Sequence, residues 1–100
     1  MANESVMEDS RSPNVSHIVY SPNFERVVRK CKKKDHNLFE QLSNQMEKII
    51  REPILGKPLR YTLKNRRRLH VGSFVLVYEF YNGELRFIDF AHHDRVYKNQ

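Results

Sequence analysis

The chain has 100 residues, of which 30% are charged and 39% hydrophobic, and its formal net charge at pH 7 is +6. This length predicts one small domain, and the sequence contains no apolar run long enough for a transmembrane helix. A single cysteine excludes a disulfide framework, and it favours a reducing compartment. No apolar signal sequence occurs among the first 20 residues, so we expect a cytoplasmic protein without a membrane partner.

The charge is unevenly distributed. The first 20 residues have three acidic and one basic side chain, which leaves a net charge of +8 for residues 21–100. A basic domain attracts polyanions such as nucleic acid, an acidic protein or an anionic membrane. Many small basic domains are nevertheless only soluble proteins, so the charge alone leaves the class of partner open.

Residues 1–16 are polar, without a hydrophobic period, and we expect a disordered tail followed by one domain at 17–100. Residues 17–21 are typical of a short strand. A helix is predicted at 22–34, because Ser21 is a good N-cap and Pro22 suits the first helical position. Its apolar residues recur at the spacing of one helix face: Phe24, Val27, Val28 and Cys31.

A second helix is predicted at 36–52, where Asp35 can cap its start and Pro53 should end it. Its apolar stripe consists of Leu38, Phe39, Leu42, Met46, Ile49 and Ile50. The connection between the helices is short, which favours an antiparallel pair. Residues 53–59 have the composition of a loop.

Three strands are predicted at about 66–71, 74–81 and 84–91. Gly72-Ser73 separates the first two, and Asn82-Gly83 is a strong hairpin signal between the second and third. Residues 74–80 are apolar on both faces, as in a central strand. We therefore predict an α+β fold: a helical hairpin packed on one face of a small twisted antiparallel sheet, in the order β-α-α-β-β-β, with residues 17–21 added at one edge.

Residues 60–70 form the most basic segment. Alternation along 66–71 should direct Leu69 and Val71 toward the helices and Arg66, Arg68 and His70 toward the open face. A charged strand edge that prevents sheets from associating is one interpretation. Arginine binds phosphate with two parallel hydrogen bonds, which favours phosphate binding instead. The candidates for this role are Arg60, Lys64, Arg66, Arg67 and Arg68.

The C-terminal segment contains His92, His93, Asp94, Arg95 and Tyr97. A polar tail after the last strand is one interpretation. General acid–base chemistry is the other, because histidine titrates near neutrality and an aromatic ring can stack on a base; Arg95 adds a further phosphate-binding candidate. We predict no metal and no cofactor here, because adjacent histidines should point in different directions and no matching His/Cys pair has the usual spacing.

Taken in this order, the elements resemble the RelE/ParE toxin family, on its RelE ribonuclease side. The motifs are PLRYTLKNRRRLHVGSFVLVYEF and IDFAHHDRVY, and the resemblance covers about residues 17–97. It implies the toxin of a type II toxin–antitoxin module, which cleaves mRNA in the ribosomal A site without a metal. It also implies a cognate antitoxin, encoded beside the toxin, whose segments wrap and silence it.

Carried over by position, the basic residues of the first strand of the hairpin fall on Arg66 and Arg68. An arginine that the family has early in the central strand is replaced by Val75. The arginine after the last strand falls on His93, and the terminal tyrosine falls on Tyr97.

Where the RelE pattern has a lysine as the base, this chain has Arg68, which stays protonated and so suits charge stabilisation. The expected catalytic residues are therefore His70 and His93 for proton transfer, with Arg68 and Tyr97. Two alternatives remain: a non-catalytic inhibitor of DNA gyrase, as in ParE-type relatives, and a plain RNA-binding domain. The second would be expected to have more surface aromatic residues than this sequence offers.

Overall fold

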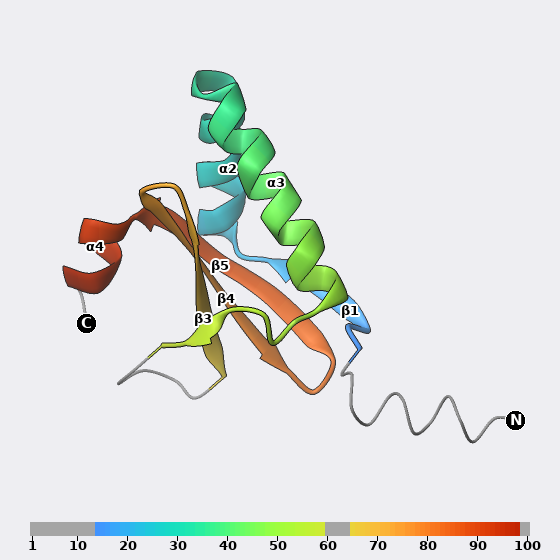
Figure 1. The fold of residues 1–100 in the computed structure, drawn as a ribbon. Helices are drawn as coiled ribbons and strands as arrows, with labels where there is room; N and C mark the ends of the chain where they lie inside the picture. The colour runs from blue at the N-terminus through green and yellow to red at the C-terminus, as the bar shows by residue number, and fades with distance from the viewer. Residues whose placement is uncertain (1–13, 60–64, 99–100) are drawn as a thin grey trace, which may run out of the picture.

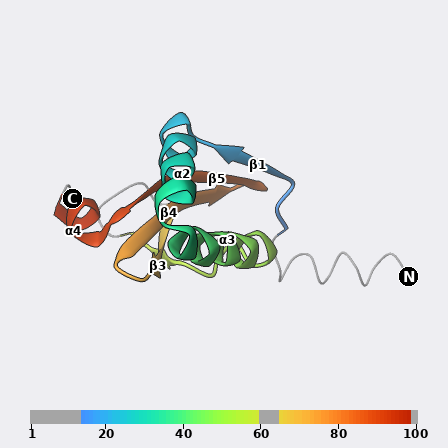
Figure 2. The same cartoon turned by 90° about the horizontal axis from the view of Figure 1, so that it is seen from above.

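The computed structural model describes residues 14–59 and 65–98, with only the backbone of 97 and 98. Its elements are β1 (His17–Tyr20), α2 (Pro22–Lys34), α3 (His36–Arg51), β2 (Lys57–Pro58), β3 (Arg66–Val71), β4 (Phe74–Tyr81), β5 (Glu84–His92) and α4 (His93–Lys98). The helices α2 and α3 lie side by side on one side of the sheet, and α4 lies beyond the end of β5 (Figures 1 and 2). The predicted α+β class is confirmed.

Local capping explains the helical hairpin. The Ser21 hydroxyl accepts a hydrogen bond from the Phe24 N–H at 3.0 Å, and its own O–H donates to the Ile88 carbonyl at 2.8 Å, so the cap also fixes α2 to β5. Asp35 ends α2 by donating its N–H to the Cys31 carbonyl at 2.9 Å. It begins α3 through its carboxylate, which accepts from the Leu38 N–H at 3.1 Å.

Replacing Asp35 with alanine should lower the free energy of unfolding by about 1 kcal/mol, because the start of α3 loses its cap. Urea unfolding followed by circular dichroism measures the change. Asn37→Ala is the matched control, since this exposed residue lies inside α3. An Asp35→Ala protein as stable as wild type would contradict the assigned cap.

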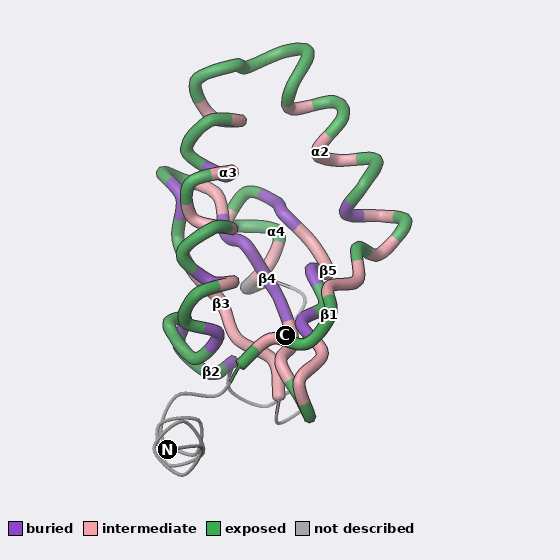
Figure 3. Tube along the Cα trace, turned by 90° about the vertical axis from the view of Figure 1, so that its right-hand side faces the viewer, coloured by how far each residue is buried: buried purple, intermediate pink, exposed green. Residues whose placement is uncertain are grey.

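The main core lies between the two helices and the sheet. Its buried residues are Phe24, Leu42, Ile49, Val71, Leu76, Tyr78, Leu85, Phe87 and Phe90. Residues 75–78 of β4 are all buried, as expected of a central strand; the trace of β4 is accordingly purple in Figure 3. Most of both predicted apolar faces is confirmed, since Leu42 and Ile49 reach this core and Val27 and Met46 pack against it. Phe39 of the predicted stripe is half-buried and lies next to Lys32 and His36 instead.

The sheet has the order β1-β5-β4-β3-β2 and is mixed. The three predicted strands are antiparallel neighbours and β1 lies at an edge, as expected, but β1 pairs with β5 in the parallel direction. Hydrogen bonds at both ends of β1 fix this pairing: Ser16 N–H to Gly83 O at 2.7 Å, and Ser21 N–H to Phe87 O at 3.0 Å. Within the predicted loop, β2 forms a two-residue strand beside β3.

The second face of the sheet is only partly open. Leu59, Val75 and Val77 form a small buried cluster there, against which Ile88 of β5 and Val96 of α4 pack. The pairing of β4 with β5 shifts between Val77 and Tyr78, where β5 contains one extra residue, Ile88. This bulge lets β5 contribute side chains both to this cluster and to the main core. The expectation that this face is entirely exposed is therefore wrong, because α4 and Leu59 cover its middle.

Most of the predicted tail, residues 1–13, lies outside the described residues. Val15 packs against the main core, and the Ser16 hydroxyl donates to the Gly83 carbonyl at 3.0 Å, so contacts with the domain begin before residue 17. None of the helices in the described ranges combines the length and the apolar character needed to cross a bilayer.

Candidate active site

Three of the predicted site residues share the second face of the sheet. On β3, Arg66, Arg68 and His70 alternate with Leu69 and Val71, which pack into the main core, so the predicted register is confirmed. Arg68 donates from Nη1 to the Pro58 carbonyl at 2.9 Å. The Nε of Arg66 is buried and has no hydrogen-bond partner among the described residues. Arg66, Arg68 and His70 therefore form a row of two guanidinium groups and one exposed imidazole on this face.

Arg67 lies on the opposite face because side chains alternate along a strand. Its Nη1 donates to the carbonyls of Gly56 and Ile54 at 2.6 and 3.3 Å. The prediction that Arg67 binds phosphate is therefore not supported by its position. Its guanidinium instead holds the segment between α3 and β2.

The same segment is held by Tyr78, which has no exposed surface. Its hydroxyl donates to the Pro53 carbonyl at 2.8 Å and accepts from the Gly56 N–H at 2.8 Å. Burial raises the pKa of Tyr78, and the hydrogen bond from Gly56 opposes this only in part. Gly56 must stay small, because a Cβ there would lie 2.7 Å from the Arg68 carbonyl oxygen.

His93 lies where β5 gives way to α4. Its N–H donates to the Ser73 carbonyl at 3.0 Å, and its Nδ1 lies 3.2 Å from Asp94 Oδ1. A carboxylate on one ring nitrogen orients an imidazole and leaves the other nitrogen for chemistry. This pairing of His93 with Asp94 has no signal in the sequence, where Asp94 belongs only to a polar segment.

The rings of His92 and His93 stack, with their centroids 4.6 Å apart. The expectation that they point in different directions is wrong, because the chain changes from strand to helix between them. The ligand atoms of His92, His93 and Asp94 lie within 4.8 Å of one another, a spacing compatible with a metal ion. The predicted absence of a metal site therefore rests only on the lack of a His/Cys pair with the usual spacing.

The sheet register brings the two candidate acid–base residues to the same end of the molecule. His70 is paired with Val75, which is paired with Ala91 of β5, two residues before His93. Two inter-strand spacings place the Cα of Ala91 about 10 Å from that of His70, and His93 lies two residues beyond Ala91. Arg68 lies about 7 Å from His70 along β3, at two residues' rise.

The remaining predicted residues are less well placed. Arg95 is 63% exposed, and its Nη2 lies 4.0 Å from Asp89 Oδ1. Tyr97 belongs to α4, but its side chain lies outside the described residues, as do Arg60 and Lys64 in the segment 60–64. Their assignments stay predictions.

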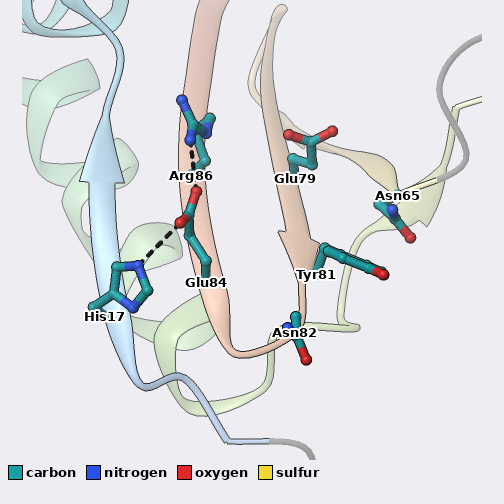
Figure 4. A pocket seen from close by; sticks show the side chains of 7 residues that line it. All are labelled: His17, Asn65, Glu79, Tyr81, Asn82, Glu84 and Arg86. Atoms are coloured by element: carbon teal, nitrogen blue, oxygen red, sulfur yellow. Dashed lines mark hydrogen bonds and ion pairs between the residues drawn. The ribbon is translucent and has the colours of Figure 1, made fainter.

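A polar concavity of about 340 Å³ lies at the other end of the same face, beside the β4–β5 hairpin (Figure 4). Its lining comes from four separate parts of the chain: His17, Asn65, Glu79, Tyr81, Asn82, Glu84 and Arg86. We call it the hairpin pocket. Glu84 is paired with Arg86 at 2.6 Å and with His17 at 3.0 Å. These hydrogen bonds, chiefly that from Arg86, lower the pKa of Glu84.

No local pattern of residues indicates this pocket, because it depends on the parallel pairing of β1 with β5. His17, the first residue of β1, closes one side of the pocket. His36 is exposed on α3 beside Glu40.

Comparison with known proteins identifies relatives of this chain. The profile of the family described as "ParE toxin of type II toxin-antitoxin system, parDE" matches residues 18–97. A protein of Methanocaldococcus jannaschii named as a candidate toxin, RelE4, is 34% identical over 82 residues, which are 79% of this chain and 87% of that protein.

Solved structures of toxins have the same fold. YafQ from E. coli superposes with a TM-score of 0.67 at 24% identity, covering 80% of this chain and 96% of YafQ. The YoeB dimer from Staphylococcus aureus gives a TM-score of 0.69 at 17% identity, covering 77% of this chain and 95% of YoeB. A chain of the E. coli DinJ–YafQ toxin–antitoxin complex superposes with a TM-score of 0.69 at 24% identity. The superposition covers 80% of this chain and 94% of that chain.

Proposed function

This chain belongs to the family of ParE toxins of type II toxin–antitoxin systems, and we propose that it acts as an endoribonuclease that cleaves mRNA in the ribosomal A site. Its substrate, mRNA on translating ribosomes, assigns it to the cytoplasm. The observation that carries the proposal is that Arg66, Arg68 and His70 share one sheet face, and that His93, next to Ser73 and Asp94, lies at the end of the sheet where His70 lies.

The proposed reaction uses the ribose 2′-OH as the nucleophile. One histidine removes the 2′-OH proton while the 2′-oxygen attacks phosphorus, and a 2′,3′-cyclic phosphate forms. The P–O5′ bond breaks, and the second histidine gives its proton to the leaving 5′-oxygen. His70 and His93 fill these two roles. No metal takes part in any of these steps.

The two arginines act on the phosphate. Negative charge on the equatorial oxygens increases in the transition state, and the guanidinium groups of Arg66 and Arg68 are held where they can stabilise it. The buried stem of Arg66 and the bond from Arg68 to Pro58 restrict their motion, so little reorganisation is needed during the reaction. We assign Tyr97 to stacking on a neighbouring base, and Arg95 to binding a phosphate other than the one that is cleaved.

The family profile that matches is described as ParE, which favours a second candidate, inhibition of DNA gyrase without catalysis. The replacement of a family arginine by Val75 fits this alternative, since Val75 is buried under Leu59 and cannot contact a phosphate. A plain RNA-binding domain is the third candidate. His70 and His93, which lie at the same end of the sheet, favour the nuclease over the other two candidates.

One experiment separates the three candidates. Translating ribosomes are incubated with the protein, and primer extension maps breaks in the mRNA; DNA supercoiling by gyrase is assayed in parallel. The nuclease gives new 3′ ends within the A-site codon and leaves supercoiling unchanged. Intact mRNA with blocked supercoiling supports the gyrase inhibitor, and RNA binding without either effect supports the binding domain.

A cognate antitoxin should raise the unfolding temperature of this chain. The domain is small and its net charge is +8 over residues 21–100, so a partner that binds only the folded form and offsets this charge stabilises it. When the free partner concentration is about 100 times the Kd, the free energy of unfolding should rise by about 2.7 kcal/mol. Differential scanning fluorimetry with the product of the adjacent gene measures the shift, which should grow with partner concentration. No shift would show that this product is not the partner.

A further inference from the structure

The hairpin pocket adjoins the proposed active site without belonging to it. In the β3–β4 register Arg66 is paired directly with Glu79, which lines the pocket. Paired side chains on one face of an antiparallel sheet have Cβ atoms about 5 Å apart. A nucleotide whose phosphate lies on Arg66 therefore has its base within reach of the pocket.

The polar groups that line the pocket differ in whether other described residues already pair with them. Both oxygens of Glu84 are paired, one with Arg86 and one with His17. In the described part of the chain, by contrast, no hydrogen bond or ion pair involves the side chains of Glu79 or Asn65. Figure 4 shows Glu79 on β4, between Arg86 on one side and Asn65 on the other. These groups are available to a ligand.

An exposed aromatic ring completes the pocket. Tyr81 is 65% exposed, which is the largest exposure among the large hydrophobic residues of the described chain. Unstacked RNA bases are bound by aromatic rings that stack on them and by hydrogen bonds to their edges. The volume of about 340 Å³ lies within the roughly 300–1,000 Å³ of small-ligand sites.

We propose that the hairpin pocket binds a guanine base of the RNA, with Glu79 on its Watson–Crick edge and Tyr81 on its face. An ionised carboxylate offers only acceptors, and guanine presents two adjacent donors, N1–H and the N2 amino group. The amide of Asn65 lies beside Glu79 and matches the neighbouring O6 acceptor. This inference rests on the proposed function, because it takes RNA as the substrate, and it adds a base preference to it.

The test measures binding rather than cleavage. A fluorescent single-stranded RNA with 2′-O-methyl riboses cannot be cut through the 2′-OH, and anisotropy reports its affinity for the purified full chain. An RNA with one guanine in an adenine background should bind about 5- to 100-fold more tightly than the same RNA with inosine, which lacks the N2 amino group. Glu79→Gln should remove this difference, and Tyr81→Ala should weaken binding of both RNAs about tenfold.

The outcomes are distinguishable from failure of the nuclease proposal. A protein that cleaves mRNA on ribosomes but binds guanine and inosine RNAs equally overturns the pocket assignment alone. A protein that neither cleaves mRNA nor binds these RNAs overturns both. If Glu79→Gln and Tyr81→Ala weaken the antitoxin complex and leave RNA affinity unchanged, the pocket is a protein interface and the assignment is wrong. The inosine comparison uses wild-type protein, so it holds even where a variant misfolds.

Discussion

Replacing His93 with alanine should slow mRNA cleavage by about 10²–10⁴-fold, the usual loss when a positioned acid or base is removed. The backbone N–H of His93 is bonded to the Ser73 carbonyl, and its imidazole lies 3.2 Å from Asp94. Alanine keeps the backbone bond, so the protein should remain folded, and expression of the variant should no longer arrest growth. Primer extension on mRNA from translating ribosomes measures the rate.

Two further variants test the same site. Arg68→Ala should also slow cleavage, through lost charge stabilisation at the phosphate, and His36→Ala is the control. His36 is 73% exposed on α3, away from the second face of the sheet, and its loss should change nothing. If His93→Ala cuts as fast as wild type, the position carried over from the family motif is wrong, and His70 with Tyr97 is the pair to test.

Tyr78→Phe should lower the free energy of unfolding by about 1–3 kcal/mol, because buried polar groups lose their partner. The variant keeps the ring in the core but leaves the Pro53 carbonyl and the Gly56 N–H without the hydroxyl that joins them. Chemical denaturation measures the loss. Tyr81→Phe, which removes a hydroxyl from a residue that is 65% exposed, is the matched control and should leave stability unchanged.

The effect of Tyr78 should depend on pH in a defined direction. Burial raises its pKa above the ordinary value of 10.0, so the folded state favours the protonated hydroxyl. Its contribution is fully present below pH 10 and is lost as the pH rises above that value, because the unfolded chain ionises first. The stability difference between wild type and Tyr78→Phe should therefore narrow in alkaline solution. A difference that widens above pH 10 would contradict the buried hydroxyl.

Much of the fold could be predicted because its signals are local. Ser21 and Pro22 mark the start of α2, Asp35 both ends it and begins α3, and Asn82-Gly83 joins β4 to β5. The alternation along β3 also places Arg66, Arg68 and His70 on one face without knowledge of the fold. These features depend on neighbours within a few residues, so the sequence alone defines them.

The features that could not be predicted depend on distant segments. The parallel pairing of β1 with β5 joins residues 67 positions apart, and it creates the hairpin pocket. Arg67 belongs to the same basic run as Arg66 and Arg68, and only its contact with Gly56 shows its structural role. The six-residue helix α4 is too short for a hydrophobic period, so the stacking of His92 on His93 had no signal in the sequence.

In the proposed mechanism the ribose 2′-OH of the mRNA is the nucleophile. Ribosomes programmed with two mRNAs that differ only by a 2′-deoxy sugar, at the nucleotide before the mapped cleavage position, test this role. We expect the ribose mRNA to be cut, with a 2′,3′-cyclic phosphate on the upstream fragment, and the deoxy mRNA to stay intact. Equal cleavage of both mRNAs would contradict the proposed mechanism.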